Sequence, residues 1–214
     1  MKQEIKGIIF DLDGVIVFTD ELHYEAWKKT ADDLGVYFDK EINNLLRGVS
    51  RMESLEIILR NYHGKPLTGE EKEAIAEKKN ERYKKLLENM NPSDVTEEVC
   101  DTLKALREKG YLLCIGSSSK NAKKILEKVE LKEMFHAISD GTNITNSKPD
   151  PEVFLKGAEF LGLQPQECLV VEDADAGIEA AIAGGLHSAA IGAAVKSGRA
   201  EYCLHRFSDL LKFL

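Results

Sequence analysis

Two aspartates, Asp11 and Asp13, stand at the end of the apolar run Ile8-Ile9-Phe10 and before Gly14. Such a run is typical of a buried strand in a parallel sheet. Residues two apart on an extended chain point to the same side, so both carboxylates would project beyond the carboxyl end of the strand, where open α/β sheets bind ligands. One carboxylate held on a divalent cation can attack phosphorus while the other moves a proton. We therefore predict Asp11 as a nucleophile and Asp13 as an acid/base; the alternative is that both simply end the strand in an Asp-Gly turn.

A serine-rich segment and a lysine offer groups that bind phosphate. The apolar run 111–115 leads into Gly116-Ser117-Ser118-Ser119-Lys120-Asn121 at a predicted helix start, where hydroxyls and free backbone N–H groups bind anions. Ser117 and Asn121 are the candidates, and an ordinary serine-rich helix cap is the alternative. Lys148 precedes a proline at the start of another predicted helix. Fixed beside a phosphate and Asp11, Lys148 would balance the negative charge of phosphoryl transfer, although a lone lysine is usually a solvated surface charge.

A second pair of acids, Glu172 and Asp173, ends the apolar run 168–171. Carboxylate oxygens that share a site with phosphate favour Mg²⁺, which prefers a few carboxylates plus water. Capping of the following helix is the alternative explanation. Because the carboxyl ends of parallel strands meet at one edge of a sheet, these acids are expected to lie close to Asp11.

The elements that would position these groups fall into two regions. Between Val15 and Met90 the apolar spacing is helical throughout, whereas from Asn91 onward helices and strands alternate. The alternation implies a parallel, doubly wound sheet with right-handed crossovers. We predict an α/β fold with a core of residues 1–17 and 91–214 and an inserted helical cap of residues 18–90. The predicted helices are 20–34, 40–46, 51–61, 69–87, 97–109, 121–129, 151–161, 176–183 and 209–213, and the later strands are 111–115, 137–139, 168–171, 188–191 and 202–204.

The composition of the chain excludes several classes of partner. The 214 residues are 43% hydrophobic and carry a formal charge of -8, with a pI near 5.3. A nucleic-acid surface would need clustered positive charge, so no nucleic-acid partner is expected. The apolar run near the amino terminus is too short for a signal peptide or a membrane span. The four cysteines have no zinc-site spacing and are predicted to be reduced, so we expect a cytoplasmic protein.

Together these residues resemble the signature of the haloacid dehalogenase superfamily. Its four regions match Asp11-Leu12-Asp13-Gly14, Ser117, Lys148 and Glu172-Asp173, in that order along the chain. The resemblance implies a Rossmann-like core with a helical cap inserted after the first motif. It also implies phosphoryl transfer through an aspartyl phosphate on Mg²⁺, with Asp11, Asp13, Glu172 and Asp173 as the metal site.

The predicted cap resembles that of the β-phosphoglucomutases. By this resemblance Thr19 lies at the hinge, Arg51 binds the phosphate remote from the reacting one, and His23 with Lys79 helps to position Asp13 and the sugar. Phe18, Arg47 and Ala174 depart from the family pattern, and none of these departures removes a catalytic group. The other phosphate- or substrate-binding residues that the resemblance implies are Trp27, Gly48, Ser54, Ser117, Ser118, Ser119, Asn121 and Lys148.

The resemblance implies that β-D-glucose 1-phosphate is isomerised to D-glucose 6-phosphate through an aspartyl-phosphate enzyme and a β-glucose 1,6-bisphosphate intermediate. Two alternatives stay open: a sugar-phosphate phosphatase on the same scaffold, and a non-catalytic protein that binds phosphosugars. The expected partner is a small phosphosugar, with no membrane contact, and nothing in the sequence requires more than a monomer.

Overall fold

The computed structural model describes residues 4–214 and contains one parallel six-stranded sheet. The strand order is β3-β2-β1-β4-β5-β6, so the chain runs outward from β1 in one direction and then resumes beside β1 in the other. The gap between β1 and β4 is therefore the topological switch point, where doubly wound sheets bind ligands. The strands are β1 (Gly7–Phe10), β2 (Leu112–Gly116), β3 (Ala137–Ser139), β4 (Cys168–Glu172), β5 (His187–Ala190) and β6 (Tyr202–Cys203).

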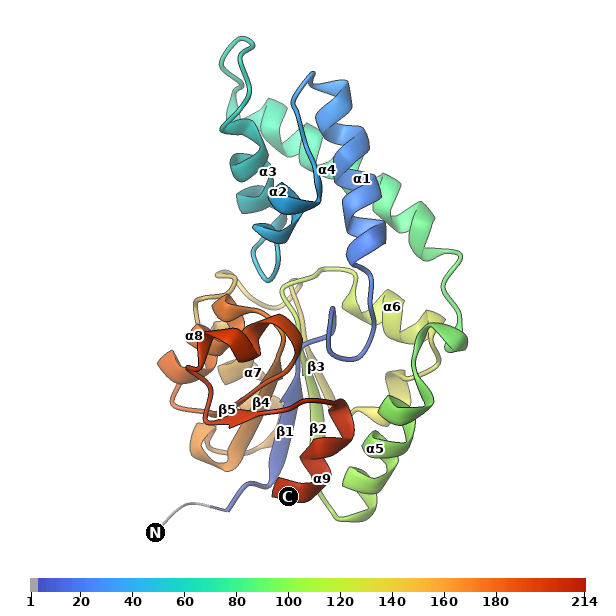
Figure 1. Ribbon diagram of the computed structural model, residues 1–214, viewed down its shortest axis with the longest axis vertical. Helices are drawn as coiled ribbons and strands as arrows, with labels where there is room; N and C mark the ends of the chain where they lie inside the picture. Colours follow the sequence, from blue (N-terminus) through green and yellow to red (C-terminus); the bar gives the residue numbers. More distant parts are fainter. Residues whose placement is uncertain (1–3) are drawn as a thin grey trace.

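Helices cover both faces of the sheet (Figure 1). Ile8 and Phe10 of β1 belong to a cluster with apolar side chains of α5, α6 and α9, whereas Ile9 belongs to a second cluster with α7 and α8. This alternation follows from the two-residue repeat of a strand. The predicted doubly wound α/β fold is confirmed. The core helices are α5 (Glu97–Glu108), α6 (Ala122–Lys128), α7 (Glu152–Leu161), α8 (Asp175–Ala183) and α9 (Leu210–Phe213).

Four further helices form a separate bundle beyond the carboxyl ends of the strands (Figure 1). The bundle, here called the cap, has its own apolar cluster, which includes Trp27, Leu55 and Ile58. Ala26 on α1 and Tyr83 on α4 belong instead to the apolar cluster that contains Ile8 and Phe10 of the sheet. Apolar packing therefore crosses the predicted boundaries at residues 17/18 and 90/91. Those boundaries stay a prediction. The helices are α1 (Asp20–Asp33), α2 (Lys40–Asn44), α3 (Arg51–Leu59) and α4 (Gly69–Leu87).

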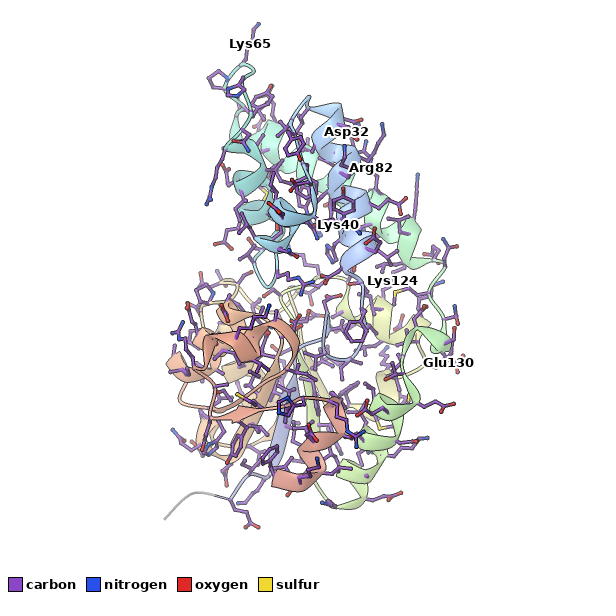
Figure 2. The ribbon with its side chains drawn as sticks, in the orientation of Figure 1. Asp32, Lys40, Lys65, Arg82, Lys124 and Glu130 are labelled. Carbon is purple, nitrogen blue, oxygen red and sulfur yellow. The ribbon has the colours of Figure 1, made fainter. Side chains whose placement is uncertain are left out.

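Local sequence signals explain where the cap helices begin. Ser50 before α3 and Thr68 before α4 each form a capping box with a glutamate three residues later, which satisfies backbone N–H groups at the helix start. Lys65, in the loop between these helices, lies at the end of the cap farthest from the sheet (Figure 2). At the other end of α4, Glu88 pairs with Lys128 of α6 at 2.6 Å and also with Lys124, which Figure 2 labels.

The structure differs from the predicted elements mainly in short 3-10 segments. Single turns at Pro92–Asp94, Lys132–Met134, Pro165–Glu167 and Phe207–Asp209, and a longer one at Gly192–Ser197, were expected as loops or helix ends. Such short turns leave no apolar periodicity in the sequence. All four cysteines are free. Within residues 4–214 no helix combines the length and apolarity needed to cross a membrane.

Candidate active site

A cavity of about 910 Å³ lies between the cap and the carboxyl ends of the strands. The loops after β1, β2, β3 and β4 line it from the core side, and the cap lines it from the other side. Of the predicted site residues, Thr19 alone is absent from its lining, and it lies directly behind one that is present, Asp13. The predicted residues that line the cavity are Asp11, Asp13, His23, Trp27, Gly48, Arg51, Ser54, Lys79, Ser117, Ser118, Ser119, Asn121, Lys148, Glu172 and Asp173.

Three acids and one lysine meet at the switch point of the sheet. Asp11, Glu172 and Asp173 each offer a carboxylate oxygen within 4.8 Å of the others, and we call this group the acid cluster. Lys148 Nζ lies 2.6 Å from Glu172 Oε1 and also pairs with Asp11 Oδ1. The lysine is 1% exposed, and its ammonium lies 4.7 Å from the centre of the Phe154 ring. The acids and the lysine that stand apart in the sequence therefore form one buried ionic group.

Burial and the close approach of like charges shift the pKa values of these side chains. Burial, followed by the charges of Glu172 and Asp11, raises the pKa of Asp173 to about 8, and burial also raises the pKa of Glu172. Burial alone would lower the pKa of Lys148, but Asp11 and Glu172 outweigh it and raise that pKa above its usual value. Several hard oxygen donors with unneutralised charge suit a divalent cation of the Mg²⁺ class. The acid cluster thus fits a metal, and its own residues would be the ligands.

The backbone turns tightly just after Asp13, where Gly14 lies against the acid cluster. Gly14 has a φ of +94°, and a Cβ atom at this position would lie 2.2 Å from Asp173 Oδ2. Only glycine fits without displacing that carboxylate, which explains the Asp-Gly pair in physical terms. The Asp13 carboxylate stands outside the acid cluster and accepts a hydrogen bond from Thr19 Oγ1, so the place of Asp13 in the metal site stays a prediction. Partial burial and the charge of Asp11 raise the pKa of Asp13 to about 7.

The cap contributes a buried lysine that has no carboxylate partner among the described residues. Lys79 Nζ is hydrogen-bonded to His23 Nδ1 at 3.0 Å and lies 4.7 Å from the ring centres of both Trp27 and Tyr83. Burial and the charge of Arg51 lower the pKa of Lys79 to about 7. Burial, together with the charges of Lys79 and Arg51, holds the pKa of His23 well below its usual value. A neutral His23 ring can accept this hydrogen bond from Lys79 through Nδ1.

A second cationic region of the cavity centres on Arg51 at the start of α3. The Arg51 side chain is 24% exposed, and its Nη1 lies 2.9 Å from Oε2 of the largely exposed Glu77 of α4. Ser54, one turn further along α3, is buried and also faces the cavity. A half-buried guanidinium with a solvent-exposed partner can exchange that partner for a phosphate.

The serine-rich loop after β2 is held in place by its own hydroxyls. Ser117 Oγ accepts from the Ser119 backbone N–H at 3.1 Å, and Ser119 Oγ accepts from the Asn121 backbone N–H at 3.2 Å. Asn121 Nδ2 donates to Asn80 Oδ1 of the cap at 3.0 Å. Ser118 Oγ donates to the Gly48 carbonyl of the cap at 3.4 Å. The loop thus touches the cap at two points across the cavity.

Several cavity residues lay outside the predicted site set. Tyr83, Asn80 and Asp20 line the cavity, as does Arg47, which had appeared only as a departure from the family pattern. Tyr83 follows Lys79 by four residues on one face of α4, a spacing that would have indicated it. Arg47 and Asp20 reach the site through the placement of the cap, for which the sequence carries no local signal.

Comparisons with known proteins match this arrangement over most of the chain. The family model for haloacid dehalogenase-like hydrolases matches residues 5–185. The β-phosphoglucomutase of Bacillus subtilis strain 168 is 38% identical over 208 residues, which cover 96% of this chain and 92% of that protein. A phosphorylated carbohydrates phosphatase of Thermotoga maritima is 29% identical, over 85% of this chain and 82% of its own. The crystal structure of a β-phosphoglucomutase from Clostridium difficile superimposes with a TM-score of 0.90 at 34% identity, covering 96% of this chain and 93% of that one.

Proposed function

The chain belongs to the haloacid dehalogenase-like hydrolase family, and on that basis we propose that it is a Mg²⁺-dependent β-phosphoglucomutase. The proposed reaction converts β-D-glucose 1-phosphate into D-glucose 6-phosphate. We further propose that it works in the cytoplasm as a monomer. The names of the relatives in Bacillus subtilis and Clostridium difficile support the proposed activity, and the net charge of -8 and the free cysteines support the proposed setting.

One observation carries the proposal: two cationic groups on different parts of the molecule line a single cavity. Lys148 stands beside Asp11 on the core, and Arg51 stands in the cap. A sugar bisphosphate needs a cation at each end, whereas a monophosphate undergoing simple hydrolysis needs only the reacting end. Arg51 would bind the remote phosphate, with Ser54, Ser118, Ser119 and Asn121 contacting ligand nearby.

The proposed cycle uses Asp11 and Asp13 in turn. Phosphorylated Asp11 donates its phosphoryl group to the C6 oxygen of β-glucose 1-phosphate, while Asp13 accepts the proton from that hydroxyl. The resulting β-glucose 1,6-bisphosphate then reverses its orientation in the cavity, so that its C1 phosphate faces Asp11. Asp11 attacks that phosphorus, the bond to the C1 oxygen breaks, and Asp13 returns the proton to the sugar. Glucose 6-phosphate leaves and the enzyme is phosphorylated again.

The other polar groups of the cavity have supporting roles in this proposal. Lys148 and Ser117 bind the oxygens of the phosphoryl group in transit. Mg²⁺ held by Asp11, Glu172 and Asp173 would neutralise charge on that group. Thr19 orients the Asp13 carboxylate through their hydrogen bond, while His23, Trp27, Lys79 and Gly48 shape the sugar site. The contacts from Ser118 and Asn121 to the cap help to exclude water, which would otherwise hydrolyse the aspartyl phosphate.

A sugar-phosphate phosphatase is the second candidate, because the relative in Thermotoga maritima carries that name and the acid cluster serves both chemistries. The two functions differ only in what accepts the phosphoryl group from Asp11. A non-catalytic phosphosugar-binding protein would keep the fold but transfer no phosphate.

The test is formation of glucose 6-phosphate from the β anomer in the presence of Mg²⁺ and a trace of glucose 1,6-bisphosphate. We expect turnover that requires the bisphosphate primer and disappears in Asp11→Asn. Turnover of the β anomer to free phosphate alone would assign the phosphatase. An Asp11→Asn variant indistinguishable from the parent in every phosphoryl-transfer assay would leave only the binding protein.

A further inference from the structure

Arg47, in the cap loop between α2 and α3, pairs with carboxylates on two different parts of the molecule. Its Nη1 lies 3.3 Å from Asp173 Oδ2 on the core, and its Nη2 pairs with Asp20 at the start of α1. Asp173 belongs to the acid cluster, whereas Asp20 belongs to the cap. We call the contact between Arg47 and Asp173 the Arg47 bridge. It ties the cap directly to a carboxylate of the proposed metal site.

The charges around the acid cluster explain why Arg47 is held there. Lys148 pairs with Asp11 and Glu172, and Arg47 supplies the positive charge beside the third acid, Asp173. Asp173 is 7% exposed, so little of its charge is screened by water. A divalent cation on the acid cluster would bring two further positive charges to the same carboxylate. Like charges at ion-pair distance in a part-buried site repel each other.

We propose that Arg47 and the divalent cation compete for Asp173, so that the Arg47 bridge weakens metal binding and metal binding loosens the bridge. The proposal rests on the Mg²⁺ site of the proposed function. The coupling is reciprocal, because two ligands that oppose each other do so by the same factor. Metal binding at the acid cluster would thus weaken one of the contacts that join the cap to the core.

Two features make Arg47 suited to leave Asp173. Its Nε is buried and has no hydrogen-bond partner within residues 4–214, so its present position leaves one donor unsatisfied. Asp20 moves with the cap and remains a partner when the bridge opens. Two other cap-to-core contacts, from Ser118 to Gly48 and from Asn121 to Asn80, involve no member of the acid cluster and need not change.

The test is a calorimetric titration of Mg²⁺ into the protein without substrate, at one pH and one ionic strength. We expect Arg47→Ala to bind Mg²⁺ about threefold to tenfold more tightly than the parent, the range for losing one repulsive part-exposed charge. Arg47→Lys keeps the positive charge on a shorter side chain, and its Mg²⁺ affinity should lie between those of the parent and Arg47→Ala. The matched control is Arg51→Ala, which removes a second cavity-lining arginine of the cap, at the start of α3, that pairs with Glu77 and not with the acid cluster. It should change the affinity less than about twofold.

Thermal unfolding gives a second, independent measurement of the same difference in Mg²⁺ affinity without any activity assay. Saturating Mg²⁺ should raise the Tm of Arg47→Ala by more than it raises that of the parent, because the variant binds the ion more tightly. An affinity in Arg47→Ala that equals or falls below that of the parent overturns the proposal, as does equal tightening in Arg51→Ala. A parent that binds no Mg²⁺ overturns the proposed metal site as well. A parent that binds Mg²⁺ but makes no glucose 6-phosphate overturns only the mutase assignment.

Discussion

Replacing Arg51 by alanine separates the role of the cap from that of the core. The guanidinium lies in the cavity, away from the acid cluster, and its partner is Glu77 at 2.9 Å. Arg51→Ala should weaken turnover of a phosphosugar, whose remote phosphate reaches the cap. It should spare hydrolysis of acetyl phosphate, which places its one phosphate on Asp11.

The magnitude follows from what Arg51 exchanges on binding. A charge-assisted hydrogen bond from a guanidinium to phosphate contributes about 1.5–3 kcal/mol. Glu77 is 57% exposed, so giving up that ion pair costs about 0–1 kcal/mol. The net contribution is then about 0.5–3 kcal/mol, which corresponds to a loss of about twofold to 150-fold in kcat/KM.

The assay compares kcat/KM for β-glucose 1-phosphate with that for acetyl phosphate in the same preparation. Arg51→Ala should show the loss on the first substrate and a change below about twofold on the second. Arg60→Ala is a suitable control, because Arg60 is an exposed arginine just after α3 that does not line the cavity. Glu77→Gln should slightly lower KM for the phosphosugar, since Arg51 then loses a competing partner. Equal losses on both substrates in Arg51→Ala would refute a role at the remote phosphate.

Three other variants test the remaining groups. Asp13→Asn should lower kcat by about 10²- to 10⁴-fold with little change in KM, because only proton transfer is lost; steady-state kinetics would contradict this if KM rose instead. Lys79→Met should raise the free energy of unfolding below about pH 7 by about 2–4 kcal/mol. A pKa of about 7 when folded against 10.5 when unfolded corresponds to a penalty of about 4–5 kcal/mol, and the lost contacts with His23, Trp27 and Tyr83 offset part of that gain. Between pH 7 and pH 10.5 the unfolded chain binds one proton more than the folded protein, so the parent gains stability as the pH rises. Urea unfolding should therefore show that the stability advantage of Lys79→Met shrinks from about pH 7 to about pH 10. An advantage that stays constant with pH would argue against a lowered pKa of Lys79. Mg²⁺ at about a hundred times its Kd should stabilise the parent by about 2.7 kcal/mol and Asp173→Ala far less.

The sequence was sufficient to predict the core of the site, because strand ends obey a simple rule. Asp11, Lys148, Glu172 and Asp173 are far apart in the chain, yet parallel strands bring their carboxyl ends to one edge. Each apolar run that ended in acids or hydroxyls therefore indicated a member of the site. The helical cap was equally visible, since no strand-like run interrupts residues 18–90.

The contacts between cap and core could not be predicted in the same way. The Arg47 bridge and the hydrogen bond from Asn121 to Asn80 depend on how the cap sits on the core. That placement is set by packing where the cap joins the core, including Tyr83 against the cluster of the sheet, and no periodicity along the chain encodes it. The position of Asp13 outside the acid cluster likewise follows from the tight turn at Gly14 and the hydrogen bond from Thr19.

The most direct test of the proposed mutase is the fate of the phosphoryl group on Asp11. β-Glucose 1-phosphate, a trace of glucose 1,6-bisphosphate and Mg²⁺ are incubated with the protein, and glucose 6-phosphate and free phosphate are followed in one tube. We predict glucose 6-phosphate as the main product, with little free phosphate, because the sugar rather than water accepts the group. Free phosphate released well above any glucose 6-phosphate would contradict the mutase and leave a phosphatase built on the same acid cluster.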